Sequence, residues 1–193
     1  MMNRKKDKRK QKEAPTITEK FKAGWMQKRP VLFFVLGFCV LMILFYTFWL
    51  SDFFELNIHP KIVSANASIS SFFLNLLGQQ TLASNQVVVS PRFSISVSRG
   101  CDAIEAMALF GAAMLAFPFK WTKKLTGLFI GIIVLFVLNL VRIISLFLTG
   151  VYAPRAFEIM HVEVWQVVFI FIALALWIFW IRMSLKQKTH AQS

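Results

Sequence analysis

The sequence predicts an all-α integral membrane protein with four transmembrane helices, an outer interfacial helix and a small β-hairpin. Three observations carry this prediction. Hydrophobic residues make up 57% of the 193 residues and the mean hydropathy is +0.61, which is far above the range of soluble globular domains. Four apolar stretches have lengths close to that of a bilayer-spanning helix, and the basic residues gather on one side of them. The composition therefore excludes an ordinary soluble domain.

The net charge of +13 is concentrated at the start of the chain. Eleven of the 22 basic residues precede residue 31, directly before the first apolar stretch. A basic run in this place is typical of a topology signal in a membrane protein, so we expect membrane lipid and no nucleic acid as its partner.

The predicted spans are residues 31–50, 103–119, 125–149 and 162–181. The first is longer than the apolar core of a signal peptide and is not followed by a small-residue cleavage pattern, so we interpret it as a retained span. The second is near the short end of the spanning range and closes at Pro118. The domain prediction is a basic cytoplasmic tail (1–30), a first transmembrane helix (31–50), an extracytoplasmic segment with the surface helix and hairpin (51–100), a three-span core (101–182) and a second cytoplasmic tail (183–193).

The positive-inside rule gives the orientation. The basic tail, the loop with Lys120, Lys123 and Lys124, and the basic C-terminal residues all lie on one side of the predicted spans. Both chain ends are therefore predicted to be cytoplasmic. On the outer side, apolar residues recur at helical spacing over 62–77 until Gly78, which predicts a helix in the membrane surface. Alternation of apolar residues with serine over 93–98 predicts a small β-hairpin.

Cys101 lies at the outer mouth of the second predicted span. Asp102 and Glu105 resemble a capping box, so we expect the thiol within the first helical turn. A helix N-terminus stabilises a thiolate, but the negative charges of Asp102 and Glu105 oppose this effect. A nearby cation is therefore needed to stabilise the thiolate. The alternative, a small interfacial residue without chemistry, stays open from this position alone. The second cysteine, Cys39, lies within the first span, and we expect no disulfide.

Arg142 lies within the third predicted span, about two helical turns below its outer end. An arginine in hydrocarbon is costly and marks a function or a specific partner. Asn139, Arg142, Ser145 and Thr149 share one helix face, which could also serve only to join helices.

His161 opens the fourth predicted span, so topology brings it to the same outer leaflet as Cys101 and Arg142. A thiol nucleophile, a guanidinium and an imidazole are the components of cysteine acyl transfer. His59 is also on the outer side and could serve in place of His161, although a loop position before a proline disfavours fixed geometry. No metal-ligand spacing and no cofactor motif are present in the sequence, so neither is expected.

These residues resemble the exosortase/archaeosortase family. The resemblance rests on "GCDAIEAM" around Cys101, on "NLVR" from Asn139 to Arg142, and on His161, and it covers about residues 87–181. It implies a membrane-embedded cysteine protease or transpeptidase in the bacterial inner membrane, with its active site facing the periplasm. Cys101 would be the nucleophile, Arg142 the partner of the thiolate and transition state, and His161 the acid and base. Asn139, Asp102 and Glu105 would bind substrate or support these groups.

The sequence departs from the pattern of many members. Larger members have about eight spans and follow the cysteine with Ser-Gly, where this chain has Asp102-Ala103. The short form is more similar to the exosortase H subgroup, which implies secreted protein substrates with a C-terminal sorting tail of the IPTL type.

A second hypothesis comes from a different class of protein. A non-enzymatic four-span transporter or envelope assembly partner would use Arg142 with Glu105 or Glu163 as a charge pair for binding.

Overall fold

A computed structural model describes residues 17–190 of the chain. The predicted tails lie partly outside these residues, which begin within the first tail and end within the second. The helices are α1 (Ile17–Trp49), α2 (His59–Leu76), α3 (Ile104–Ala116), α4 (Trp121–Tyr152), α5 (Phe157–Ile159) and α6 (Trp165–His190), with short π or 3-10 segments η1 (Phe54–Ile58), η2 (Pro154–Ala156) and η3 (Met160–Val164). The strands are β1 (Leu82–Ser84), β2 (Val87–Val89) and β3 (Ser94–Ser96).

Three helical segments are long and apolar enough to cross a membrane: Arg29–Trp49, Trp121–Tyr152 and Pro154–Met183. The predicted second span corresponds to α3, which has 13 residues and is about 20 Å long at 1.5 Å per residue. That is shorter than the hydrocarbon core of about 30 Å, so the count of four spans is not confirmed. The helix begins only at Ile104. It ends at Ala116 because Phe117, the residue before Pro118, is held in an extended conformation.

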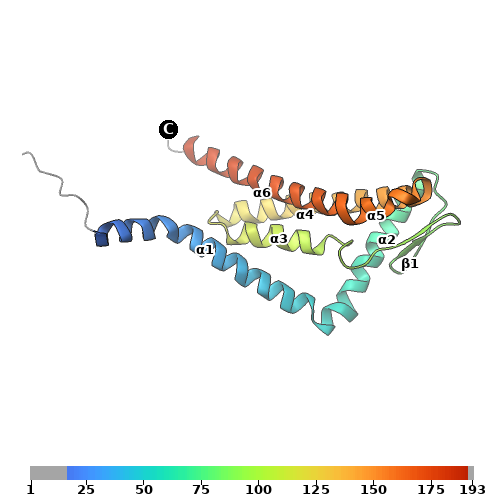
Figure 1. The fold of residues 1–193 in the computed structure, drawn as a ribbon, viewed down its shortest axis with the longest axis horizontal. Coiled ribbons are helices and arrows are strands. Elements are labelled where there is room, and N and C mark those ends of the chain that lie inside the picture. The colour runs from blue at the N-terminus through green and yellow to red at the C-terminus, as the bar shows by residue number, and fades with distance from the viewer. Residues whose placement is uncertain (1–16, 191–193) are drawn as a thin grey trace, which may run out of the picture.

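The long helices place the two described chain ends on one side and the site on the other. In Figure 1, the start of α1 and the end of α6 lie together on the left, and α2 and the sheet lie at the opposite end. Helix α3 packs against α1, α4 and α6. At Gly131 of α4, an added Cβ would lie 2.0 Å from the ring of Phe110 on α3.

The outer segment contains the predicted helix and hairpin. Strands β2 and β3 pair antiparallel, with Val88 opposite Ile95, and this confirms the hairpin. The sheet also has a third strand, β1, which pairs antiparallel with β2 after a turn at Asn85, whose φ is 53°. The sequence prediction missed this strand because its three residues are all exposed and lack an apolar alternation.

Helix α2 buries a mixed face, in which Val63, Ala67 and Leu74 of the core lie beside polar residues. Asn66, Ser70 and Ser71 face the protein, whereas Phe72 and Leu76 are exposed. The Ser71 and Thr81 hydroxyls lie 2.9 Å apart and are hydrogen-bonded. The predicted apolar stripe therefore exists, and it faces outward while polar contacts fix α2 to the sheet. The position of this helix in the membrane surface stays a prediction.

Candidate active site

Cys101 lies in a tight loop before α3. The loop turns at Gly100, whose φ is 83°, and the Cys101 N–H donates to the Ser98 carbonyl at 2.9 Å. Ala103 then adopts a left-handed φ of 59° and precedes the first residue of the helix. The expectation that Cys101 lies in the first helical turn is therefore wrong, because this left-handed residue separates it from the helix. Cys101 is buried and not in a disulfide.

The predicted capping box is also wrong. The Asp102 Oδ1 accepts the N–H of Ile104 at 3.2 Å, which is two residues away instead of three. The left-handed turn at Ala103 shifts the helix start beyond the reach of a box between Asp102 and Glu105. Asp102 still satisfies one of the unpaired N–H groups of the first helical turn.

The structure brings the thiol and the imidazole together. The Cys101 Sγ and the His161 Nε2 lie 2.9 Å apart, a hydrogen-bonding distance. His161 belongs to the π-helical segment η3, and its ring stacks on Phe157 with centroids 5.7 Å apart. Single π-helical turns are frequent at functional sites because they redirect one side chain of a helix.

Arg142 joins the loop of Cys101 to the segment of His161. Its guanidinium donates to the Gly100 carbonyl at 2.7 Å and to the His161 carbonyl at 3.5 Å. The group also lies 5.5 Å from the centroid of the Phe169 ring. The buried Nε–H has no partner among residues 17–190. One donor of this charged group is thus left without an acceptor in the described part of the chain.

The environment of Cys101 raises the pKa of its thiol. Burial is the largest cause, because it disfavours the charged thiolate. The positive charge of Arg142 lowers the pKa, and the negative charge of Asp102 raises it further. The resting group is therefore a thiol, which needs a base to become a nucleophile, and His161 is the imidazole within reach.

His59 differs from its sequence-based prediction. It is the first residue of α2 and is buried, and its Nε2 lies 3.0 Å from the Asp102 Oδ2. Its geometry is therefore fixed, contrary to the expectation for a loop residue before a proline. The imidazole that contacts Cys101 is that of His161, so the two histidines hold different partners.

The remaining predicted site residues lie around this centre. Asn139 is on α4, one turn before Arg142, and its fully buried amide has no hydrogen-bond partner in the described part of the chain. Glu105 is half-buried on α3. Within the described residues, Arg142 forms no ion pair with Glu105 or Glu163, the pairs that the binding-protein hypothesis requires.

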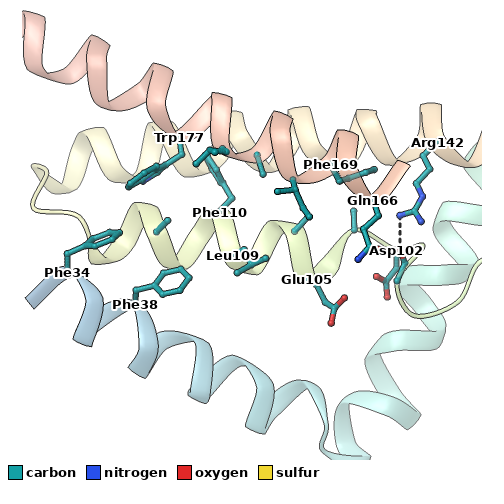
Figure 2. Close-up of a pocket in the computed structure, with 17 residues that line it drawn as sticks. Phe34, Phe38, Asp102, Glu105, Leu109, Phe110, Arg142, Gln166, Phe169 and Trp177 are labelled. Carbon is teal, nitrogen blue, oxygen red and sulfur yellow. Dashed lines mark hydrogen bonds between the residues drawn. The ribbon is translucent and has the colours of Figure 1, made fainter. Parts of the chain in front are cut away.

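A cavity of about 540 Å³ extends from the site along α3. Arg142, Asp102 and Glu105 lie at its polar end, and Phe34 of α1 and Trp177 of α6 lie at its apolar end (Figure 2). The sequence analysis missed this lining, because it comes from residues of α1, α3 and α6 that look like ordinary lipid-facing positions. Among the described residues, no group of histidine, cysteine, aspartate and glutamate could hold a metal ion.

Comparison with known proteins identifies the family. The sequence model described as transmembrane exosortase (Exosortase_EpsH) matches residues 23–185, which is most of the chain. The chain belongs to the transmembrane exosortase family. This confirms the family named from the residue pattern, whereas the narrower exosortase H subgroup stays a prediction. No curated protein and no solved structure matches the chain.

Family membership and the three long apolar helices make this exosortase a membrane protein, and they support a membrane-embedded sorting enzyme in general terms. The matched region contains Cys101, Arg142 and His161 together with the helices that position them.

Proposed function

We propose that this exosortase is a cysteine peptidase or transpeptidase that cleaves a C-terminal sorting signal of secreted proteins at the outer leaflet. The observation that carries the proposal is the 2.9 Å contact between the Cys101 thiol and the His161 imidazole, beside an arginine whose Nε–H has no partner among the described residues. A nucleophile within hydrogen-bond reach of its base is the geometric signature of covalent acyl transfer. Bacterial inner-membrane location, with the site facing the periplasm, is part of this proposal.

The reaction begins when the His161 Nε2 takes the thiol proton and the Cys101 Sγ attacks the scissile carbonyl carbon. The carbonyl oxygen gains the electron pair and accepts hydrogen bonds from Arg142. The tetrahedral intermediate collapses with cleavage of the C–N bond, and the imidazolium gives its proton to the leaving amine. A thioester remains on Cys101. An amine, a hydroxyl or water then attacks the thioester, loses its proton to His161 and releases the thiol.

Arg142 fits its role because its position does not depend on the substrate. Two backbone carbonyls hold the guanidinium, one beside the nucleophile and one on the base. Donors that are fixed before the reaction stabilise a developing oxyanion without reorganisation, and removing one such donor typically lowers kcat by about 10² to 10³-fold.

The cavity supports a substrate with an apolar tail. Its polar end is lined by Gly100 and Asp102, the neighbours of Cys101 in the sequence, and its apolar end extends toward the side of the molecule that holds the chain ends. We expect the membrane helix of the sorting tail to dock beside α3, α4 and α6, with side chains near the scissile bond entering the cavity. The IPTL-type motif is the first tail to test.

The proposal is tested by co-expressing the enzyme with a secreted reporter that carries an IPTL-type tail and measuring tail removal on a gel. The chain provides a matched control in its second thiol, which lies exposed on α1. Cys101→Ala should abolish the shorter product, and Cys39→Ala should leave it unchanged. Equal processing by wild type and Cys101→Ala would refute the nucleophile.

A further inference from the structure

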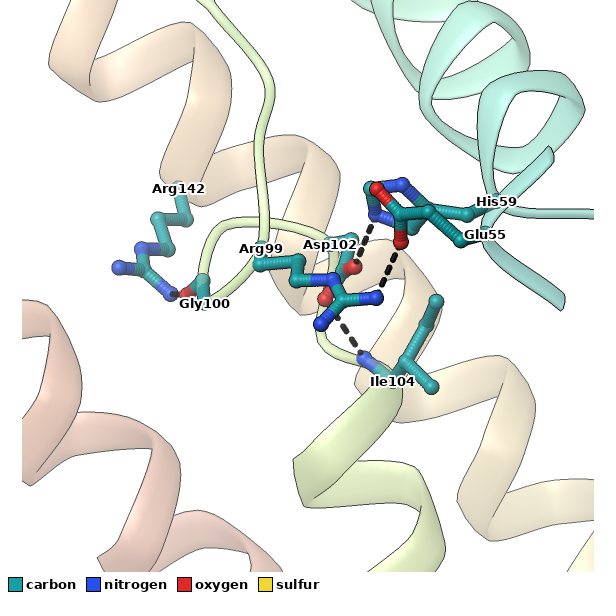
Figure 3. A network of polar contacts seen from close by, with 7 residues as sticks. All are labelled: Glu55, His59, Arg99, Gly100, Asp102, Ile104 and Arg142. Carbon is teal, nitrogen blue, oxygen red and sulfur yellow. Dashed lines mark hydrogen bonds and ion pairs between the residues drawn. The ribbon is translucent and has the colours of Figure 1, made fainter. Parts of the chain in front are cut away.

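A second histidine, His59, contacts the loop of the nucleophile at a different residue from His161. His59 and Asp102 are both more than nine-tenths buried, and they form a hydrogen-bonded pair at 3.0 Å between α2 and the loop. A carboxylate accepts hydrogen bonds, so the His59 Nε2 carries the proton of this bond. Figure 3 shows the pair beside the start of α3, with the second carboxylate oxygen on the Ile104 N–H.

Three consecutive residues of this loop each bind a different element. The Gly100 carbonyl accepts from Arg142 of α4, the Cys101 thiol contacts His161 of η3, and the Asp102 carboxylate binds His59 of α2. The thiol is thus held between two anchors, one on each side in the sequence. Directly after them, Ala103 adopts the left-handed conformation, which non-glycine residues keep only where their surroundings enforce it.

We infer that His59 is a positioning residue for the nucleophile: through Asp102 it holds the loop so that the Cys101 thiol stays against His161 and Arg142. This inference rests on the proposed function, since it concerns the geometry of the proposed nucleophile. The π-helical segment η1 ends directly before His59, just as η3 contains His161. His161 therefore lies within a locally widened helical turn and His59 directly follows one, and both contact the same loop.

The charged and titratable groups around the thiol determine its pH response. Four groups from surrounding helices face the loop: Arg142 of α4, His161 of η3, His59 of α2 and Glu105 of α3. The loop itself contributes Asp102 and Arg99, and Arg99 is paired with Glu55. Loss of the His59 anchor would let the loop move away from Arg142 and His161. The thiol would then lose its contact with the His161 imidazole and its closeness to the Arg142 charge, so we expect it to react more slowly at neutral pH.

The test measures alkylation of Cys101 by iodoacetamide against pH, in the full-length protein in detergent micelles and a Cys39→Ser background. It needs no substrate, so its result is independent of whether the reporter is cleaved. His59→Gln retains an N–H donor near the Nε2 position, whereas His59→Asn places the amide near Nδ1. His59→Phe retains the ring contact with Phe54, whose centroid lies 6.2 Å away, without a donor.

We expect His59→Gln to react within about threefold of wild type, because its donor still reaches Asp102. His59→Asn and His59→Phe should react at least tenfold more slowly at neutral pH, because the thiol loses its contact with His161. Equal profiles for the glutamine and asparagine variants would overturn the inference, as would a phenylalanine variant that behaves like wild type. The comparison of glutamine with asparagine decides the question even if the phenylalanine variant does not fold.

A matched control is available in the same loop. Arg99 pairs with Glu55 and lies 4.5 Å from the centroid of the Trp49 ring, so it also ties the loop to the first half of the chain, but at an exposed position (Figure 3). Glu55→Gln breaks that exposed pair and should leave the alkylation profile unchanged. A loss of rate equal to that of His59→Asn would show that any tether of the loop has the same effect, and would overturn the specific role of His59.

Discussion

At the residue scale, the reactivity of Cys101 depends on three opposing influences. Burial and Asp102 raise the pKa of the thiol, and Arg142 lowers it. Because the pKa of the thiol is raised overall, half of the Cys101 thiols should be ionised only at a pH above the ordinary cysteine pKa of about 8.5. Iodoacetamide alkylation of the Cys39→Ser protein as a function of pH measures this directly. An alkylation rate that is half-maximal at a pH well below that value would contradict the account.

Arg142→Gln should displace the same alkylation profile further to high pH. The substitution removes the positive charge that lowers the pKa of Cys101, so the thiol should react more slowly at pH 7.5, by roughly tenfold for each pKa unit. Arg155→Gln removes an exposed cation in η2 and serves as the charge control. A profile displaced to lower pH in Arg142→Gln would contradict the assigned electrostatics.

At the element scale, the site depends on close packing of α3 against α4. The Phe110 ring lies directly over Gly131, where an added Cβ would approach to 2.0 Å, and Phe110 is buried and cannot move freely. Gly131→Ala should therefore lower the free energy of unfolding by about 1 to 3 kcal/mol. Thermal unfolding in detergent would measure the change.

Gly37 provides the control for that substitution. It faces Ala116 across the contact between α1 and α3, where a new Cβ would lie at an ordinary 3.7 Å. Gly37→Ala should leave the midpoint of unfolding within error of wild type. If the two variants unfolded alike, close packing at Gly131 would not be what holds α3 in place.

Helix α2 should lie in the membrane interface with Phe72 and Leu76 toward lipid. The expectation follows from the exposure of these two apolar side chains and from the burial of the opposite face against the protein. A fluorescent label at either position should be quenched by spin-labelled lipid, whereas a label at the exposed turn residue Asn85 should not be. Equal quenching at all three positions would contradict the predicted orientation of α2.

At the scale of the whole molecule, the sequence predicts much of the fold for a simple reason. Hydropathy and charge bias alone locate the long helices and bring Cys101, Arg142 and His161 to one end of them. The pairing of His59 with Asp102 was not predicted, because it joins residues 43 positions apart in the sequence. The local signal was there: a histidine directly after the first span, on the side of the membrane that holds the thiol.

The shape of the cavity also escaped the sequence analysis. A residue such as Trp177 follows the apolar pattern of a lipid-facing helix, and only the packing of α1, α3 and α6 shows that it lines an interior space. The length of α3 was overestimated for a related reason: hydropathy continues through Phe117 and Phe119, but the residue before Pro118 leaves the helical conformation.

The predicted topology applies to the molecule as a whole. Both described chain ends lie on one side and the sheet lies on the other (Figure 1). Single cysteines introduced at the exposed positions Lys120 and Asn85 should therefore react from opposite sides of the membrane. In intact cells, an impermeant maleimide should label the cysteine at 85 and label the one at 120 only after lysis. Equal labelling at both positions would contradict the predicted orientation.

The most direct test of the central claim is to trap the acyl-enzyme. A tailed reporter should form a covalent adduct with the enzyme on a denaturing gel, and hydroxylamine should release it because a thioester is labile to this amine. Mass spectrometry should place the bond on the peptide that contains Cys101, and Cys101→Ala should form no adduct. An adduct that persists in Cys101→Ala, or processing that proceeds in that variant at the wild-type rate, would contradict the account.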